Sequence, residues 1–254
     1  MQRKIASNDV LASNALNGRY VPPADWRAAA ISELLSGTRR DTLEPKQIDW
    51  VNAVTTQQGG DSGKVFIAGD ETLIKKRCIA VIGARKVSDL GRQRARKLGR
   101  QLAEHDVVVV SGLADGVDTE ALSEAIAAGG HVIAVIGTPL DQAYPAKNKR
   151  LQESIYRDHL LISQFVAGTR VFPSNFPARN RTMAALADAT VVIEASDSSG
   201  TLHQAAECVR LGRWLAIAKS VVIDPALKWP RQFLDYPKCL QLESTEQLIS
   251  AVYG

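Results

Sequence analysis

The stretch FPARNR, residues 176–181, places two arginines on either side of an asparagine, directly before the apolar run TMAALADATVVIEA. The guanidinium groups of Arg179 and Arg181 can each offer a bidentate fork to a phosphate, and Asn180 can cap a helix that follows. Phe176 offers a ring face on which a base could stack, or fills the core. These residues alone fit an anion grip and a charged surface turn equally well.

Four other short segments share a glycine-rich or hydroxyl-rich composition, and each follows an apolar run. They are GARKVSD (83–89), SGLADGVD (111–118), GTPLDQAYP (137–145) and SDSSGTL (196–202). Such turns let a ligand approach the backbone, and amides and hydroxyls at a helix start suit phosphate oxygens. Capping by Ser88 and Asp118 explains part of this composition. Lys149, one of the basic residues that follow the third segment, is a further candidate. The candidate phosphate contacts are thus Gly83, Arg85, Ser111, Gly112, Lys149, Ser199, Gly200 and Thr201.

Residues suited to catalysis are sparse. The four histidines are isolated, and no Ser/His/Asp or Cys/His grouping is visible. Glu194 and Glu207 are the acid–base candidates, and Glu207 equally fits an ordinary helix position. Neither GxGxxG nor a Walker A loop occurs, and the cysteines lack zinc-type spacing. We therefore expect a binding protein rather than an enzyme, with no metal and no cofactor.

The elements that must position these loops follow from the pattern after Lys64. Apolar runs alternate with amphipathic stretches such as GRQRARKLGRQLAEH and DTEALSEAIAAGG, as in parallel sheets covered on both faces. The sequence predicts an α/β fold, an extended Rossmann-like, doubly wound and mostly parallel sheet with helices on both faces. The predicted strands are CIAVIG, VVVVSG, HVIAVIG, LLIS, TVVIEA and WLAIA.

The chain divides by composition into three parts. Residues 1–65 are expected to form a small helical extension, with ADWRAAAISELL as a helix and TTQQGGDSG (55–63) as a linker. Residues 66–220 form the Rossmann-like domain. Residues 221–254 form a C-terminal tail with a short helix.

The bulk composition indicates the cellular compartment in which the protein works. The 254 residues carry a net charge of +4 and three scattered cysteines. An odd number of cysteines argues against a disulfide framework, and the N-terminus lacks an apolar signal region. We expect a cytoplasmic protein with no membrane association.

Taken together, five ordered segments resemble the DprA/Smf family of DNA-processing proteins. They are IAVIGAR (79–85), SGLADGVD (111–118), AVIGTPLDQAYPAKN (134–148), FPARNR (176–181) and VVIEASDSSGTLHQAAECVRLGR (191–213). The resemblance implies a homodimer that binds single-stranded DNA and acts in recombination or transformation, with a RecA-type recombinase as a partner. It implies DNA contact by Arg85, Ser111, Lys149, Phe176, Arg179, Asn180, Arg181, Ser199 and Gly200.

The chain departs from the family pattern in ways that suggest a divergent member. Ala84 replaces a serine and Leu122 a histidine, and about 35 residues follow the last predicted strand. That is too few for the C-terminal winged helix of many members, so we expect a minimal form. The alternative is a nucleotide-binding or nucleotide-cleaving protein of the lysine-decarboxylase-like Rossmann superfamily, whose PGGxGTxxE motif is echoed by SSGTLHQAAE. Under that interpretation Glu194 or Glu207 is catalytic and Arg179 holds the phosphate.

Overall fold

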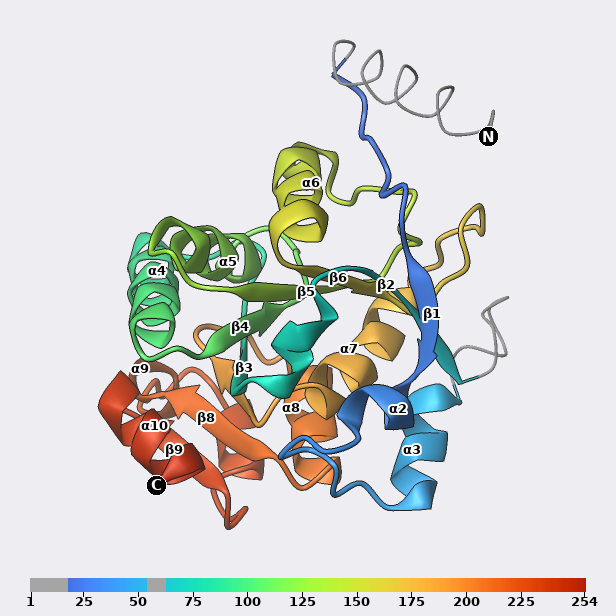
Figure 1. The fold of residues 1–254 in the computed structure, drawn as a ribbon. Helices are drawn as coiled ribbons and strands as arrows, with labels where there is room; N and C mark the ends of the chain where they lie inside the picture. Colours follow the sequence, from blue (N-terminus) through green and yellow to red (C-terminus); the bar gives the residue numbers. More distant parts are fainter. Residues whose placement is uncertain (1–17, 54–62) are drawn as a thin grey trace, which may run out of the picture.

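One nine-stranded sheet organises the protein. The computed structural model describes residues 18–53 and 63–254, and its strands lie in the order β1-β2-β6-β5-β4-β3-β7-β8-β9 (Figure 1). All neighbours from β6 to β9 run parallel, whereas β1 and β2 are antiparallel additions at one edge. The predicted fold class, a mostly parallel α/β sheet of the Rossmann type, is confirmed.

All six predicted strands are present, because each is an apolar run that the sheet buries on both faces. They are β3 (Cys78–Ile82), β4 (Val108–Ser111), β5 (Val132–Ile136), β6 (Leu160–Ser163), β7 (Ala189–Val192) and β8 (Trp214–Ala218). Three further strands were not predicted. They are β1 (Arg27–Ala30), β2 (Lys64–Gly69) and β9 (Cys239–Leu242).

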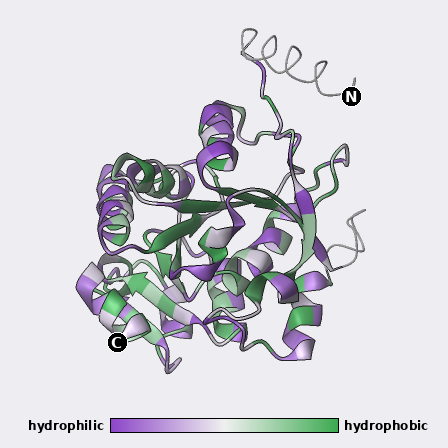
Figure 2. Cartoon of the chain, in the orientation of Figure 1, coloured by the Kyte–Doolittle hydropathy of each residue, from purple (hydrophilic) through white to green (hydrophobic). Residues whose placement is uncertain are grey.

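Helices cover both faces of the sheet. One face carries α4 (Asp89–Glu104), α5 (Val117–Ala127), α6 (Lys149–Asp158) and α10 (Thr245–Tyr253). The other carries α2 (Ile31–Leu35), α3 (Pro45–Asn52), α7 (Asn175–Ala185), α8 (Thr201–Arg210) and the short α9 (Lys219–Val222). Figure 2 shows the apolar strands enclosed between helices whose outer faces are hydrophilic. Alternate strand residues serve the two cores, as Ile79 and Ala80 do in β3.

The strand order reverses beside β3. From β3 the chain proceeds through β4, β5 and β6 to one side of the sheet, and then returns to place β7, β8 and β9 on the other side. The carboxyl ends of β3 and β7 therefore flank a topological switch point. In open α/β sheets this is where ligands bind, because the two loops leave the sheet in opposite directions and open a crevice.

The segments predicted as extension and tail each contribute to the same sheet. The expected helix ADWRAAAISELL is wrong in its first half, since Arg27–Ala30 pairs with β2 as a strand and only Ile31–Leu35 is helical. The tail supplies β9 beside β8, and then the expected short helix, α10. The predicted linker lies almost wholly outside the described residues.

A buried ion pair ties the segment between α2 and α3 to the sheet at the amino ends of its strands, on the side opposite the switch point. Arg40 Nη1 lies 2.9 Å from Asp188 Oδ2, and the Arg40 side chain is fully buried. The same carboxylate oxygen accepts hydrogen bonds from the Cys78 backbone N–H and the Tyr253 hydroxyl, both at 2.9 Å. Asp188 thus joins the segment before α3, strand β3 and the last helix. Among the described helices, none is long and apolar enough to cross a membrane.

Candidate nucleic-acid interface

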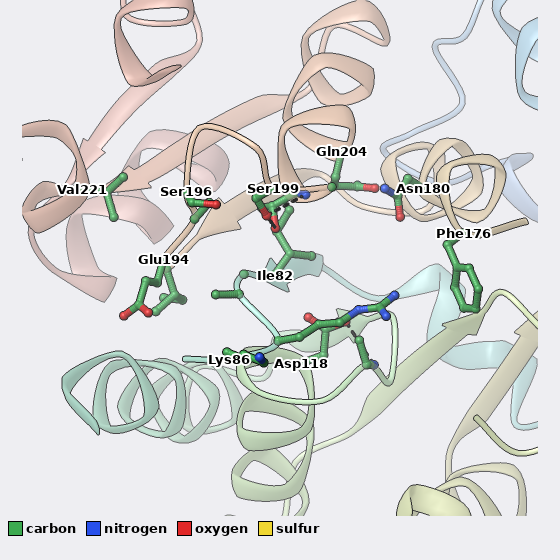
Figure 3. Close-up of a pocket in the computed structure, with 18 of the residues that line it drawn as sticks. Ile82, Lys86, Asp118, Phe176, Asn180, Glu194, Ser196, Ser199, Gln204 and Val221 are labelled. Atoms are coloured by element: carbon green, nitrogen blue, oxygen red, sulfur yellow. Dashed lines mark hydrogen bonds between the residues drawn. The ribbon is translucent and has the colours of Figure 1, made fainter. Parts of the chain in front are cut away.

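A pocket of about 680 Å³ opens at the switch point between β3 and β7. Its walls come from the loops after β3, β4, β7 and β8 and from the first turns of α7 and α8. In Figure 3, Phe176 lies at one end and Val221 at the other, with Ser199 and Asn180 between them and Lys86 and Asp118 across the opening. The predicted residues that line this pocket are Gly83, Arg85, Phe176, Arg179, Asn180, Ser199, Gly200 and Thr201.

The loops after β3 and β4 meet without any side chain between them. Gly116 has φ +80°, and a Cβ on it would overlap the carbonyl oxygen of Ala84. Ala84 in turn donates its N–H to the Glu194 carbonyl at 2.7 Å, which joins the ends of β3 and β7. Glycine at position 116 is therefore required both by its backbone conformation and by the closeness of the neighbouring loop.

Three exposed cations line the pocket: Arg85, Lys86 and Arg94. None of them forms an ion pair within 4.0 Å with a carboxylate in the described part of the chain. Ser88 caps α4 as predicted, its Oγ accepting from the Gly91 N–H at 3.0 Å, and Arg94 lies further along the same helix. The lining also includes the carboxylates of Asp118, Glu194 and Asp224, but none of these pairs with the three cations, whose positive charge therefore stays available to an anion.

Two aromatic rings extend the pocket on the β5 side. The ring centroids of Phe176 and Tyr144 are 5.5 Å apart, and the Tyr144 side chain is 49% exposed. The Arg85 guanidinium carbon lies 5.4 Å from the Phe176 ring centroid. A flat ligand could therefore contact an aromatic face and a cation at the same time.

The start of α8 forms the opposite rim. The helix begins at Thr201 with Gly200 as its N-cap, and Ser199 Oγ accepts from the Thr201 N–H at 3.2 Å while donating to Thr201 Oγ1 at 2.8 Å. The predicted group of hydroxyls and amides is thus assembled at a helix N-terminus. Its partial positive charge adds to the field of the three cations.

Arg179 lines the floor of the pocket instead of its mouth. Its side chain is almost wholly buried, and Nη1 donates to the Val135 carbonyl at 2.5 Å. The guanidinium lies against Gly112, where any Cβ would overlap it. Burial lowers the pKa of Arg179 to about 10, although the nearby Asp118 carboxylate opposes that change. Arg179 is therefore a desolvated charge that supports the pocket from below.

Asp118 is the counter-charge of Arg179, and its predicted role as a helix cap is wrong. The helix α5 has Gly116 as its N-cap, and Asp118 is the second residue of its first turn, accepting from the backbone N–H groups of Gly112 at 3.1 Å and Ala114 at 3.3 Å. Burial raises the pKa of Asp118, against the opposing effect of Arg179. The carboxylate fixes the SGLADG loop around the arginine.

Arg181 does not share this pocket. Its guanidinium carbon lies 3.7 Å from the Trp50 ring centroid, and Nε is 3.8 Å from Glu207 Oε1. The two arginines of FPARNR, both predicted to contact phosphates, therefore do not line the same pocket. Helix α7 already begins at Asn175, so Asn180 lies within the helix and does not cap it.

Three other predicted contacts also lie elsewhere. Lys149 Nζ donates to the Gly18 carbonyl, Ser111 Oγ is buried and donates to the Val81 carbonyl at 2.7 Å, and Gly112 serves as the seat of Arg179. Lys149 begins α6, away from the switch point. These positions support neighbouring structure and do not line the pocket.

The two acidic candidates for catalysis are both occupied by structural contacts. Glu194 accepts from the Ser88 N–H at 2.9 Å and from Ser88 Oγ at 2.6 Å, so it holds the start of α4. Glu207 accepts from Trp50 Nε1 at 2.7 Å and does not line the pocket. No group of three acidic, histidine or cysteine side chains suited to a metal occurs in residues 18–53 or 63–254.

Sequence reasoning missed Lys86, Arg94 and Tyr144. Lys86 adjoins the predicted Arg85, and Tyr144 belongs to GTPLDQAYP (137–145), one of the turns expected to let a ligand approach. Arg94 belongs to the arginine-rich helix, and only the orientation of that helix distinguishes it from its neighbours.

Comparison with known proteins identifies the relatives of this fold and pocket. Residues 53–241 match the profile of the family described as DNA recombination-mediator protein A. The chain belongs to this family. The match spans β2 to β9 and thus every loop that builds the pocket, and it confirms the resemblance drawn from the five sequence segments.

Individual relatives agree with this assignment. The DNA processing protein DprA of Streptococcus pneumoniae is 40% identical over 160 residues, covering 63% of this chain and 56% of the relative. A putative DprA of Mycobacterium tuberculosis is 37% identical over 212 residues, covering 79% of this chain and 54% of the relative. The chain thus spans about half the length of these curated relatives.

Solved structures share the architecture. The X-ray structure of DprA from Streptococcus pneumoniae matches with a TM-score of 0.71 and 30% identity, covering 91% of this chain and 75% of that one. DNA processing protein A from Helicobacter pylori, described for its single-stranded DNA binding mode, matches with a TM-score of 0.70 and 21% identity, covering 89% and 94%. The second likeness establishes the fold alone.

Proposed function

We propose that this protein binds single-stranded DNA in the pocket between β3 and β7. The observation that carries the proposal is the combination of three exposed cations, Arg85, Lys86 and Arg94, with the half-buried ring of Phe176 in one pocket. Tyr144 packs beside that ring, and the cations form no ion pair within the described residues. Cations neutralise phosphates, and aromatic faces stack on bases that are free of a complementary strand. A relative in the same family fold, from Helicobacter pylori, is described as binding single-stranded DNA.

The phosphate contacts of the proposed site differ from those predicted by sequence. Arg85 and Lys86 would contact phosphates from the β3 loop, while Ser199, Gly200 and Thr201 would offer hydroxyl and amide donors from the opposite rim. Arg179 and Asp118 would act beneath them by holding the loops in position. Arg181 pairs with Glu207 outside the pocket, so it is not among the proposed contacts.

Membership of a family named for recombination mediation supports a wider role. We infer that the protein works in the cytoplasm as a homodimer, and that it passes bound DNA to a RecA-type recombinase during recombination or transformation. In this role it would bind DNA without chemistry, cofactor or metal. Glu194 and Glu207 are each engaged by neighbouring side chains, which favours binding over nucleotide cleavage.

The test measures the binding of fluorescently labelled oligothymidine by fluorescence anisotropy at a series of salt concentrations. Duplex DNA of the same length and a mononucleotide serve as competitors. Arg85→Ala with Lys86→Ala should weaken single-strand binding at least tenfold and make the salt dependence shallower by about 0.7 per lost phosphate contact. The matched control is Lys149→Ala with Arg181→Ala, which removes two charges from outside the pocket and should leave affinity within about twofold.

The outcomes separate the candidate functions. Equal loss of affinity in the two double variants would show that only net charge matters and would overturn the site. Tighter binding of duplex than of single strands would overturn the proposed substrate. Release of free base from nucleoside monophosphates would favour the nucleotide-cleaving alternative.

A further inference from the structure

A second groove adjoins the pocket on the side of β8 and β9. It lies between α4 and the carboxyl ends of these strands, has a volume of about 560 Å³, and shares Arg94, Ile193 and Ser220 with the pocket. We call it the α4 groove; its further lining includes Lys97, Gln101, Lys219, Ile223 and Thr245. Because three residues line both hollows, the groove begins where the pocket ends, within reach of a chain-like ligand that leaves the pocket.

The cations of α4 divide into two stripes. Arg92 and Arg96 both pair with Glu120 of α5, at 2.8 and 2.6 Å, and Arg100 Nε donates to Glu124 at 2.9 Å. Arg94 and Lys97 lie on another side of the helix, where positions three apart are neighbours. Neither makes an ion pair with a carboxylate of residues 18–53 or 63–254. The only α4 cations left unneutralised in those residues are thus the two that face the groove.

The remaining groove surface is compatible with a polynucleotide. Glu243 is the acidic residue in the lining, and Lys219 Nζ neutralises it at 3.0 Å. Ile223 is 64% exposed, and with Leu242 it gives the groove an apolar side for sugars or bases. The wall along α4 is cationic and the opposite wall is neutral or apolar, which matches the two sides of a single strand.

We infer that the α4 groove carries the continuation of the DNA strand beyond the pocket, with phosphates along Arg94 and Lys97. This inference rests on the proposed function. It assigns the path of the DNA, which runs from the aromatic pair Tyr144 and Phe176 across the switch point to the carboxyl ends of β8 and β9. Longer strands then occupy both hollows, whereas short ones occupy the pocket alone.

The test compares oligothymidines of about four and about fifteen nucleotides on the full chain, within the range of site sizes that such proteins show. Lys97→Glu should weaken binding of the longer strand about tenfold and reduce its salt slope, while binding of the short strand changes less than about twofold. Arg100→Glu is the matched control, because it makes the same change in net charge on the same helix but outside the groove lining. Circular dichroism of both variants verifies that they are folded.

Each result decides a different question. If the wild-type protein does not bind the short strand, the proposed function fails and the inference with it. The inference also fails if the short strand binds but the longer strand binds no more tightly than the short one. It fails likewise if the longer strand keeps its higher affinity in Lys97→Glu, because the groove would then not contact the DNA. An equal loss in Lys97→Glu and Arg100→Glu would show a general charge effect and would likewise overturn the inference.

Discussion

Arg179 and Arg181, two residues apart in α7, direct their guanidinium groups into separate environments. Arg179 Nη1 donates to the Val135 carbonyl at 2.5 Å beneath the pocket, whereas the Arg181 guanidinium stacks 3.7 Å from the Trp50 ring centroid. In an α-helix, residues at i and i+2 do not share a face. The FPARNR motif therefore divides its two charges between the floor of the site and the packing of α7 against α3.

Arg181→Ala should cost stability but not DNA affinity. The variant loses the contact with Trp50 and the ion pair with Glu207, so we expect the free energy of unfolding to fall by about 1 kcal/mol. Urea unfolding measures the loss, and anisotropy with oligothymidine should give an affinity within about twofold of wild type. Arg181→Lys is the control for charge alone. A tenfold weaker affinity in a folded Arg181→Ala protein would return this residue to the DNA contacts.

The buried pair of Asp118 and Arg179 predicts a specific pH dependence of stability. Burial raises the pKa of Asp118 in the folded protein, so the folded state retains its proton at a pH where the unfolded chain has released it. Stability from this group is present below the unfolded pKa of about 3.9 and is lost as the pH rises to the folded pKa.

Asp118→Asn removes this titration. The difference in unfolding free energy between wild type and Asp118→Asn should therefore decline as the pH rises from about 4, and then level off once the folded carboxyl has ionised. Urea unfolding at a series of pH values provides the comparison. A difference that grows with pH would mean that Arg179 outweighs burial and holds the carboxylate ionised.

The ion pair of Arg40 and Asp188 should matter for stability alone. Asp188→Ala leaves the fully buried Arg40 without its carboxylate, and we expect a loss of about 3–5 kcal/mol in unfolding free energy. Tyr253→Phe removes one hydrogen bond to the same oxygen and should cost about 2 kcal/mol. Both variants lie at the amino-end edge of the sheet, so the protein that remains folded should bind oligothymidine normally. A loss below 1 kcal/mol for Asp188→Ala would refute the role assigned to this pair.

The central strands were predictable because a strand that is buried on both faces is a continuous apolar run in the sequence. The runs CIAVI and VIAVI are apolar at every position, as a parallel strand between two helical layers requires. β1 has no such run, since RAAA resembles a helix segment and becomes a strand only by pairing with residues 64–67. β9 is half-buried at the other edge and reads CLQL. Edge strands depend on contacts between distant parts of the chain, and a local pattern does not contain those contacts.

The candidate site was predictable in its loops but not in its side-chain directions. The glycines and hydroxyls after β3 and β7 mark the pocket, because their requirement is local to each turn. The separation of Arg179 from Arg181 depends on where α7 begins, and the freedom of Arg94 depends on which stripe of α4 meets Glu120 and Glu124. These are properties of the packing between helices, which the order of residues does not reveal by itself.

Phe176 offers a way to distinguish base stacking from phosphate binding. Its ring lies 5.5 Å from Tyr144 and beneath the Arg85 guanidinium, and it is half-buried at the end of the pocket. Phe176→Ala should weaken oligothymidine binding by about 1–3 kcal/mol, because one base loses its stacking surface. Since the number of phosphate contacts is unchanged, the salt dependence of binding should stay parallel to that of wild type.

Two substitutions at the same position make this prediction specific. Phe176→Trp keeps an aromatic face and should retain most of the affinity, whereas Phe176→Leu keeps an apolar side chain without a ring and should behave like alanine. Anisotropy at several salt concentrations gives both the affinity and the slope for each variant. Full affinity in Phe176→Leu would mean that the ring only fills space beside Gly137, and a shallower salt slope in Phe176→Ala would mean that its loss displaces Arg85 from the phosphates.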